Sequence, residues 1–176
     1  MFHLRKYLYL LFISFEKFIN TYRFPINMKT IHHIWLTVYC KAEDNEEIIL
    51  TNLRKFFPFK LEDEKLSIER HSAMSFEERK IIIFQVHLQK QNHIRRFITY
   101  LNEILNEEQK HLLLKQKESR LDNENHFFIR FDKDKLLSDN KYFITDKGNC
   151  YHLKMSIASY PTTRENALRV VEEILK

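Results

Sequence analysis

The segment "KIIIFQVHLQKQNHIRRFITYLNEIL" (residues 80–105) changes its hydrophobic period halfway, and this change decides the fold class. In the first half, Ile82, Phe84, Val86 and Leu88 alternate with other residues, which is the period of a strand with one buried face. In the second half, after a predicted cap at Asn92, apolar residues recur at helical intervals of three and four: Ile94, Phe97, Ile98, Leu101, Ile104 and Leu105. The segment therefore predicts a strand followed directly by an amphipathic helix.

The same two periods recur along the rest of the chain. Alternation predicts further strands over residues 32–40, 64–71, 126–132, 141–145 and 150–157. Helical spacing predicts helices after caps at Asp44, Asn106 and Thr162. Hairpins mixed with helices indicate the α+β class, with a single antiparallel or mixed sheet and helices packed mainly on one face. The other face of the sheet is then open.

Composition excludes several classes of protein. The chain has 176 residues and a single glycine, so it holds neither a P-loop nor a Rossmann fingerprint, which both need several glycines. Cys40 and Cys150 lie far apart in predicted strands and form no metal-binding spacing, so we expect free thiols in the cytoplasm. We expect no cofactor and no bound metal.

Residues 1–27 differ in charge from the rest of the chain. They carry a net charge of +3 of the total +5, so the body is nearly neutral. Their apolar run is too short to span a membrane and lacks a small-residue cleavage site. We interpret residues 1–27 as an N-terminal extension, with Met28 as an alternative start, and residues 28–176 as one α+β domain.

The predicted register places a mixed set of side chains on the open face of the sheet. Aromatic rings, histidines and cations on one pleated surface suit base stacking and phosphate contact. A solvated face, or a homodimer interface that covers the aromatic rings, explains the same pattern. The residues predicted to point outward are Trp35, Thr37, Tyr39, Lys65, Ser67, Glu69, Gln85, His87, Phe128, Arg130, His152, Lys154 and Ser156.

A catalytic interpretation rests on Asp132 and Asp134. Paired carboxylates could hold a metal in a hydrolase, but these two lie among Arg130, Lys133 and Lys135, so ion pairing is the simpler interpretation. We therefore expect a protein that is not an enzyme.

Three segments resemble a family of small archaeal proteins described as predicted RNA-binding proteins and candidate exosome subunits. The segment "RLDNENHFFIRFDKDKLL" (120–137) resembles the family's Arg-Leu-Asp-Glu, strand and Arg-Phe-Asp-Lys-Gln motif. The segments at 32–58 and 157–175 are similar to its first strand and helix and to its Tyr-Pro-helix end. At residues 71–80 the chain keeps only His71 of the family's glycine-rich turn, which puts any RNA contact of that turn in doubt.

The resemblance implies a ribosomal-protein-L5-like fold and non-catalytic binding to RNA, including double-stranded RNA, read by shape and backbone. It also implies the exosome as a partner; a structural homodimer without RNA affinity stays open as the alternative. We expect Asp132 to orient the neighbouring cations or to cap the following turn. The residues predicted to contact RNA are Arg130, Lys133, Lys135, Lys154, His71, His87 and His152.

Overall fold

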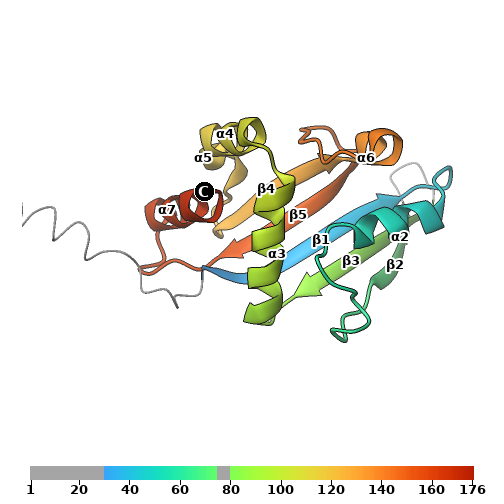
Figure 1. Cartoon of the computed structure of the whole chain (residues 1–176), viewed down its shortest axis with the longest axis horizontal. Coiled ribbons are helices and arrows are strands. Elements are labelled where there is room, and N and C mark those ends of the chain that lie inside the picture. The colour runs from blue at the N-terminus through green and yellow to red at the C-terminus, as the bar shows by residue number, and fades with distance from the viewer. Residues whose placement is uncertain (1–29, 75–79) are drawn as a thin grey trace, which may run out of the picture.

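The computed structural model describes residues 30–74 and 80–176. Within these residues five strands form one sheet in the order β2-β3-β1-β5-β4, and every neighbouring pair is antiparallel (Figure 1). The strands are β1 (Ile31–Cys40), β2 (Glu69–Met74), β3 (Lys80–Leu88), β4 (His126–Asp132) and β5 (Cys150–Ile157). The α+β class is thus confirmed, and the sheet is antiparallel.

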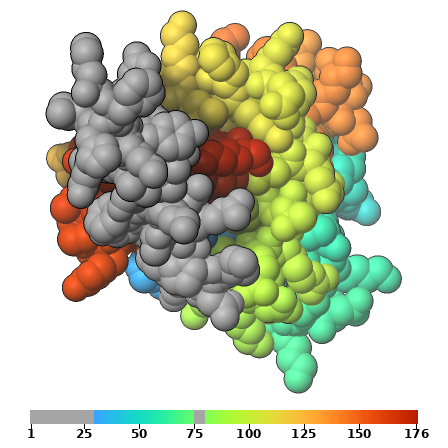
Figure 2. Space-filling model, turned by 60° about the vertical axis from the view of Figure 1, so that its left-hand side comes forward, coloured from blue at the N-terminus to red at the C-terminus, as the bar shows by residue number. Residues whose placement is uncertain are grey.

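Six helices accompany this sheet in the described part of the chain. They are α2 (Glu46–Arg54), α3 (Gln91–Ile104), α4 (Glu107–Lys115), α5 (Lys117–Arg120), α6 (Lys133–Asp139) and α7 (Arg164–Ile174). In Figure 1, α2 and α3 cross the near side of the sheet. Figure 2 shows α7, in red, beside the yellow-green α3, where Asn102 Nδ2 donates to the carbonyl oxygen of Ile174 over 2.7 Å. The helices α2, α3 and α7 therefore form a layer on one face.

The core lies between this helix layer and the sheet. Phe56, which follows α2, packs its ring against Phe131, Tyr142 and Tyr151 at centroid distances of 5.1, 5.1 and 5.2 Å. Alternate residues of every strand except β2 are buried on this side, since period-2 alternation sends only one set inward. The inward residues of the three central strands include Ile34, Leu36, Val38, Phe84, Val86, Leu88, Tyr151, Leu153 and Met155.

Several boundaries agree with the predictions from sequence. The predicted strands 126–132 and 150–157 coincide with β4 and β5. Asn106 and Gln109 form the predicted capping box at the start of α4, with Asn106 Oδ1 accepting from Gln109 N over 2.8 Å. Cys40 and Cys150 are buried, free thiols.

The predicted strand over 64–71 is wrong in its boundaries. Lys65 adopts a left-handed φ of 56° and closes a turn, with Leu66 N donating to Leu61 O over 2.8 Å. The strand β2 begins only at Glu69, so Lys65 and Ser67 lie outside the sheet. The short strand predicted at 141–145 is also wrong, because only an isolated bridge joins Ile144 to Phe131.

Three predicted helix caps are displaced, and one helix has no counterpart among the predictions. Asn45 caps α2 in place of Asp44, and the residue before α3 is Lys90, without a side-chain cap. Thr163, not Thr162, caps α7. The unpredicted helix is α6, which starts directly at the end of β4.

Some expectations fall outside the described residues. These are the extension at 1–27, the alternative start at Met28 and the centre of the turn at 75–79. Within residues 30–74 and 80–176, no helix combines the length and apolar character needed to cross a bilayer.

Candidate nucleic-acid interface

The sheet register builds a row of side chains across the face opposite the helices, which we call the open face. Trp35 on β1 pairs with His87 on β3 and with Lys154 on β5. Lys154 pairs in turn with Phe128 on β4. Since paired residues point to the same side of a sheet, these four side chains form one row over four strands.

The rings of this row stack on their neighbours. The Trp35 and His87 rings have centroids 4.8 Å apart at an interplanar angle of 17°, and His33 stacks on Trp35 at 5.4 Å. At the other end of the row, Phe128 stacks on His152 at 5.3 Å and 16°. The two ring groups give the open face a flat, half-buried aromatic surface.

Lys154 lies between the two ring groups. Its Nζ is 5.3 Å from the centroid of Trp35 and 5.9 Å from that of Phe128, both within cation–π range. Its side chain has no ion pair with any residue of 30–74 or 80–176. The ammonium group can therefore take an anionic partner while the rings beside it stay in place.

The next row carries the second cation of the open face. Arg130 on β4 pairs with His152 on β5, and Thr37 lies across from both His152 and Gln85. Thr37 Oγ1 donates to Gln85 Oε1 over 3.1 Å. Arg130 is half-buried and has no carboxylate partner among the described residues, so its guanidinium can also take an anion.

Two histidines of the open face, His87 and His152, have pKa values below the ordinary value of histidine. Burial, followed by the nearby His33, lowers the pKa of His87. Burial, followed by the charges of Arg130 and Lys154, lowers the pKa of His152. His33 Nδ1 and His87 Nε2 lie 3.1 Å apart, so one ring donates and the other accepts. Protonation of these rings would add positive charge to the face.

The structure brings five of the seven predicted RNA-contacting residues to this sheet face. Arg130, Lys154, His87 and His152 lie in the two rows. His71 pairs with Ile83 on the neighbouring strand, is exposed, and has its Nε2 3.4 Å from Glu69 Oε2. Of the other predicted outward residues, Ser156 pairs with His33 and His126, and Tyr39 pairs with Ile83, on the same face.

Lys133 was predicted to contact RNA phosphate, but the structure buries its side chain. Its side chain is only 1% exposed, and Nζ donates to Asp44 Oδ2 over 2.7 Å and to Tyr39 O over 3.1 Å. Lys135 lies on α6, outside the sheet, and pairs with Asp139 at 3.5 Å. Neither lysine joins the two rows.

Asp132 caps the next element, as one of its two predicted roles required. Its Oδ1 accepts from Lys135 N over 3.0 Å at the start of α6. Asp134 instead accepts from Asn149 Nδ2 at 3.0 and 3.1 Å. The two carboxylates thus serve local hydrogen bonds, which offers no particular support to a hydrolase site.

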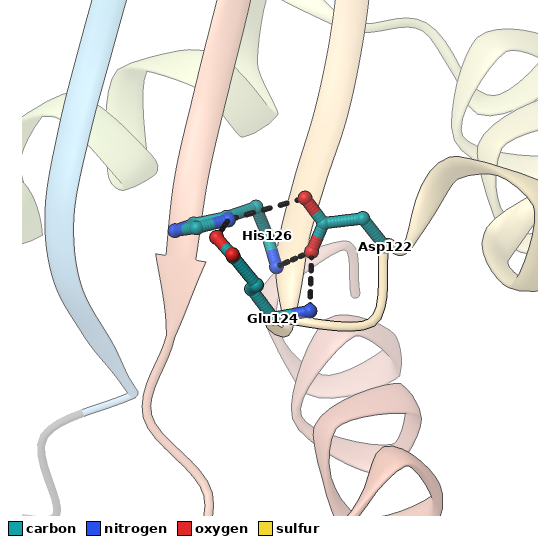
Figure 3. A group of neighbouring side chains, drawn as sticks. All are labelled: Asp122, Glu124 and His126. Carbon is teal, nitrogen blue, oxygen red and sulfur yellow. Dashed lines mark hydrogen bonds and ion pairs between the residues drawn. The ribbon is translucent and has the colours of Figure 1, made fainter.

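Sequence reasoning missed His33 and His126, which also lie on the open face. Extending the alternation by two residues before Trp35 and before Phe128 would have found them. The His126 ring meets Trp35 edge-on at 6.1 Å. In the turn before β4, Asp122 Oδ1 accepts from His126 N over 2.8 Å, and Asp122 Oδ2 lies 3.1 Å from His126 Nδ1 (Figure 3). The turn therefore fixes the His126 ring.

This turn also holds one set of side chains that could bind a metal ion. Single ligand atoms of Asp122, Glu124 and His126 all lie within 4.8 Å of one another (Figure 3). The hydrogen bonds to backbone amides and the ion pairs within the set account for this arrangement without a metal. The expectation that the protein binds no metal stays a prediction.

A family model and a relative of known sequence each match most of this chain. A family model described as RNA binding matches residues 33–175. The RNA-binding protein PAB1135 of Pyrococcus abyssi is 23% identical over 146 residues, which are 82% of this chain and 94% of that protein.

Solved structures are similar over nearly the same region. A crystal structure of a protein from Archaeglobus fulgidus matches with a TM-score of 0.74 and 24% identity, over 82% of this chain and 99% of that one. A DUF54 protein from Methanothermobacter thermautotrophicus matches with a TM-score of 0.67 and 25% identity, over 84% and 100% of the two chains. These structures share the α+β fold described above.

Proposed function

The chain belongs to the family described as RNA binding, and from this premise we propose that it binds RNA across the open face of its sheet. The observation that carries the proposal is the position of Lys154, whose ammonium lies over the rings of both Trp35 and Phe128. A cation between two aromatic surfaces can meet a phosphate while the flanking bases lie on the rings.

Single-stranded RNA fits this surface better than a duplex. Bases of an unpaired strand can splay out and stack on aromatic side chains, whereas duplex bases are already stacked on each other. The outward side chains of the two rows are mostly rings and cations, with few amides to read base edges. We therefore expect binding that tolerates many sequences and depends on backbone contacts.

Removing the charges of Arg130 and Lys154 tests the proposal. The variant Arg130→Gln/Lys154→Gln should weaken binding to a labelled single strand in fluorescence anisotropy. The slope of log K against log salt is negative, and each lost phosphate contact lowers its magnitude by about 0.7 for single strands, so the double variant should lose about 1.4 in magnitude.

A matched control removes the same charge elsewhere. Arg95 on α3 and Lys115 on α4 are exposed and lie on helices, so Arg95→Gln/Lys115→Gln should leave the slope nearly unchanged. Equal losses in the two double variants would mean that net charge, and not the open face, holds the RNA.

A homodimer is the alternative use of the same face. Its continuous ring surface could be buried by a second copy, which would cover Trp35 and Tyr39. Sedimentation equilibrium separates the two: a tight dimer that RNA does not dissociate would contradict RNA binding at this face. Binding to duplex RNA, partnership with the exosome, a cytoplasmic location, an L5-like fold and the lack of catalysis remain predictions.

A further inference from the structure

A pocket lies beside the open face at the β4 edge of the sheet. It has a volume of about 260 Å³, below the roughly 300 Å³ at which pockets for drug-sized ligands begin. Phe128 and Arg130 belong to both the open face and the pocket, so the two surfaces are continuous. The lining comes from the end of α4, from α5, from β4 and from the loop before β5: Gln116, Ser119, Arg120, Phe128, Arg130 and Asp146.

The pocket has more positive than negative charge. Arg120 is 7% exposed, and its Nη2 donates to Asp146 Oδ1 over 3.0 Å. Its Nε and Nη2 also donate to Gln116 Oε1 over 2.9 and 2.7 Å, which fixes the guanidinium plane. Arg130 adds a second guanidinium without a carboxylate partner among residues 30–74 and 80–176. Two cations thus share one carboxylate, and an anion in the pocket would complete the charge balance.

The side chains favour a phosphate as this anion. Guanidinium groups bind phosphate oxygens through charge-assisted hydrogen bonds, which Arg130 can supply as a parallel pair. Arg120, whose Nε and Nη2 already donate to Gln116 and Asp146, offers its Nη1. The ring of Phe128 at the rim offers a surface for the base or sugar attached to that phosphate. The volume suits one nucleotide end and not several nucleotides.

The walls of the pocket indicate which phosphate it takes. β4 is the last strand of the sheet, and α5 stands beyond it, because Leu121 after α5 pairs with Phe127 of β4. An RNA strand that crosses the open face toward β4 therefore meets α5 and the loop before β5 that holds Asp146. A terminal phosphate also carries about 1.5 to 2 negative charges, more than the single charge of an internal one.

From these features we infer that the pocket binds the terminal phosphate of an RNA strand lying on the open face. This inference rests on the proposed function and adds a preference for one kind of RNA end. The same phosphate chemistry could come from a free mononucleotide, so the test must separate the two sources.

The experiment compares one RNA sequence in three forms by anisotropy competition with the full chain. The forms carry a 5′-phosphate, a 3′-phosphate or hydroxyls at both ends, and adenosine monophosphate serves as the free probe. One phosphorylated form should bind about tenfold more tightly than the hydroxyl form, as expected for charge-assisted hydrogen bonds worth about 1.4 kcal/mol or more.

A variant localises the effect to the pocket. Ser119 is exposed at the pocket, so Ser119→Glu places a carboxylate there and should abolish the phosphate preference, measured as the ratio of the affinities for the phosphorylated and hydroxyl forms. Thr51→Glu puts the same charge on an exposed site of α2 and should retain the preference. Arg120→Lys is a second test of the pocket and should also reduce the phosphate preference. Circular dichroism checks that this variant folds.

Each outcome decides the inference. Equal binding of all three RNA forms overturns the pocket assignment and leaves RNA binding at the open face standing. Adenosine monophosphate that binds as tightly as the phosphorylated RNA overturns it in favour of a free nucleotide. Failure of every RNA form to bind overturns the proposed function and this inference with it.

Discussion

Asp44→Asn should destabilise the protein more than Lys133→Met, although both changes break the same ion pair. The Lys133 side chain is 1% exposed, and that of Asp44 is 18% exposed. Asparagine at position 44 removes the negative charge and leaves a buried ammonium with only neutral acceptors, such as the Tyr39 carbonyl 3.1 Å away. Leaving a buried charge unpaired costs about 3–5 kcal/mol.

Lys133→Met leaves the more exposed partner behind. The Asp44 carboxylate keeps its hydrogen bond from Lys41 N, 2.8 Å long, and can reach water. We expect a loss of about 1.5–3 kcal/mol, typical of one charged hydrogen bond. The double variant Asp44→Asn/Lys133→Met should be more stable than Asp44→Asn alone, because it leaves no buried charge at this site.

Urea unfolding followed by circular dichroism measures these differences, provided that the m-value stays constant. The pH dependence gives an independent check. Burial acts to raise the pKa of Asp44, but the bonds from Lys133 and from Lys41 N outweigh it, so the pKa lies below its ordinary value of 3.8. The stabilisation is therefore complete at neutral pH and is lost as pH falls below about 4 toward the lowered pKa.

Two results would refute this reasoning. One is a Lys133→Met variant that loses as much stability as Asp44→Asn. The other is a Lys133→Met variant that stays fully stable but binds RNA more weakly, because Lys133 would then contact RNA and not Asp44.

Three further predictions concern the fold and the face. Asn106→Ala removes the capping box of α4 and should lower the unfolding free energy by about 1 kcal/mol in urea titrations, with exposed Glu108→Ala as the control. Phe56→Ala should cost about 3–5 kcal/mol in the same assay, since its ring is 1% exposed and contacts three others; a loss below about 1 kcal/mol would contradict this packing. RNA affinity should rise as pH falls below about 6.5, because His87 and His152 have lowered pKa values and gain charge only there; His87→Gln/His152→Gln should flatten the profile, and a rise that persists in this variant would point to other groups.

Helices and strands were predicted best where a single hydrophobic period, of a strand or of a helix, ran without interruption. The strand and helix of residues 80–105, the strand at 126–132 and the strand at 150–157 each show a strict alternation or a long helical stripe. For this reason the register of Trp35, His87, Phe128, Arg130 and Lys154 on one face followed from alternation alone. The order of strands in the sheet, which brings these residues into rows, is a tertiary property that no local pattern contains.

Prediction failed where a local conformation or a distant partner decides the outcome. The left-handed backbone at Lys65 delays β2, and nothing in "EDEKLS" requires it. The motif "RFDK" looks like a row of surface charges, yet Lys133 is buried because Asp44, 89 residues earlier, provides its counter-ion. The pocket joins Arg120 and Asp146, which are 26 residues apart and belong to different elements. Such pairings become visible only in the folded chain.

The most direct test of the central claim is the fluorescence of Trp35 during titration with single-stranded RNA. The chain has one tryptophan, and its indole lies in the first of the two rows of the open face, between His87 and Lys154. If RNA stacks on this face, emission excited at the red edge of the tryptophan band should be quenched along the same binding curve that anisotropy reports, and added salt should reverse both. Tight RNA binding by anisotropy with unchanged Trp35 emission would contradict the account and place the RNA on another surface.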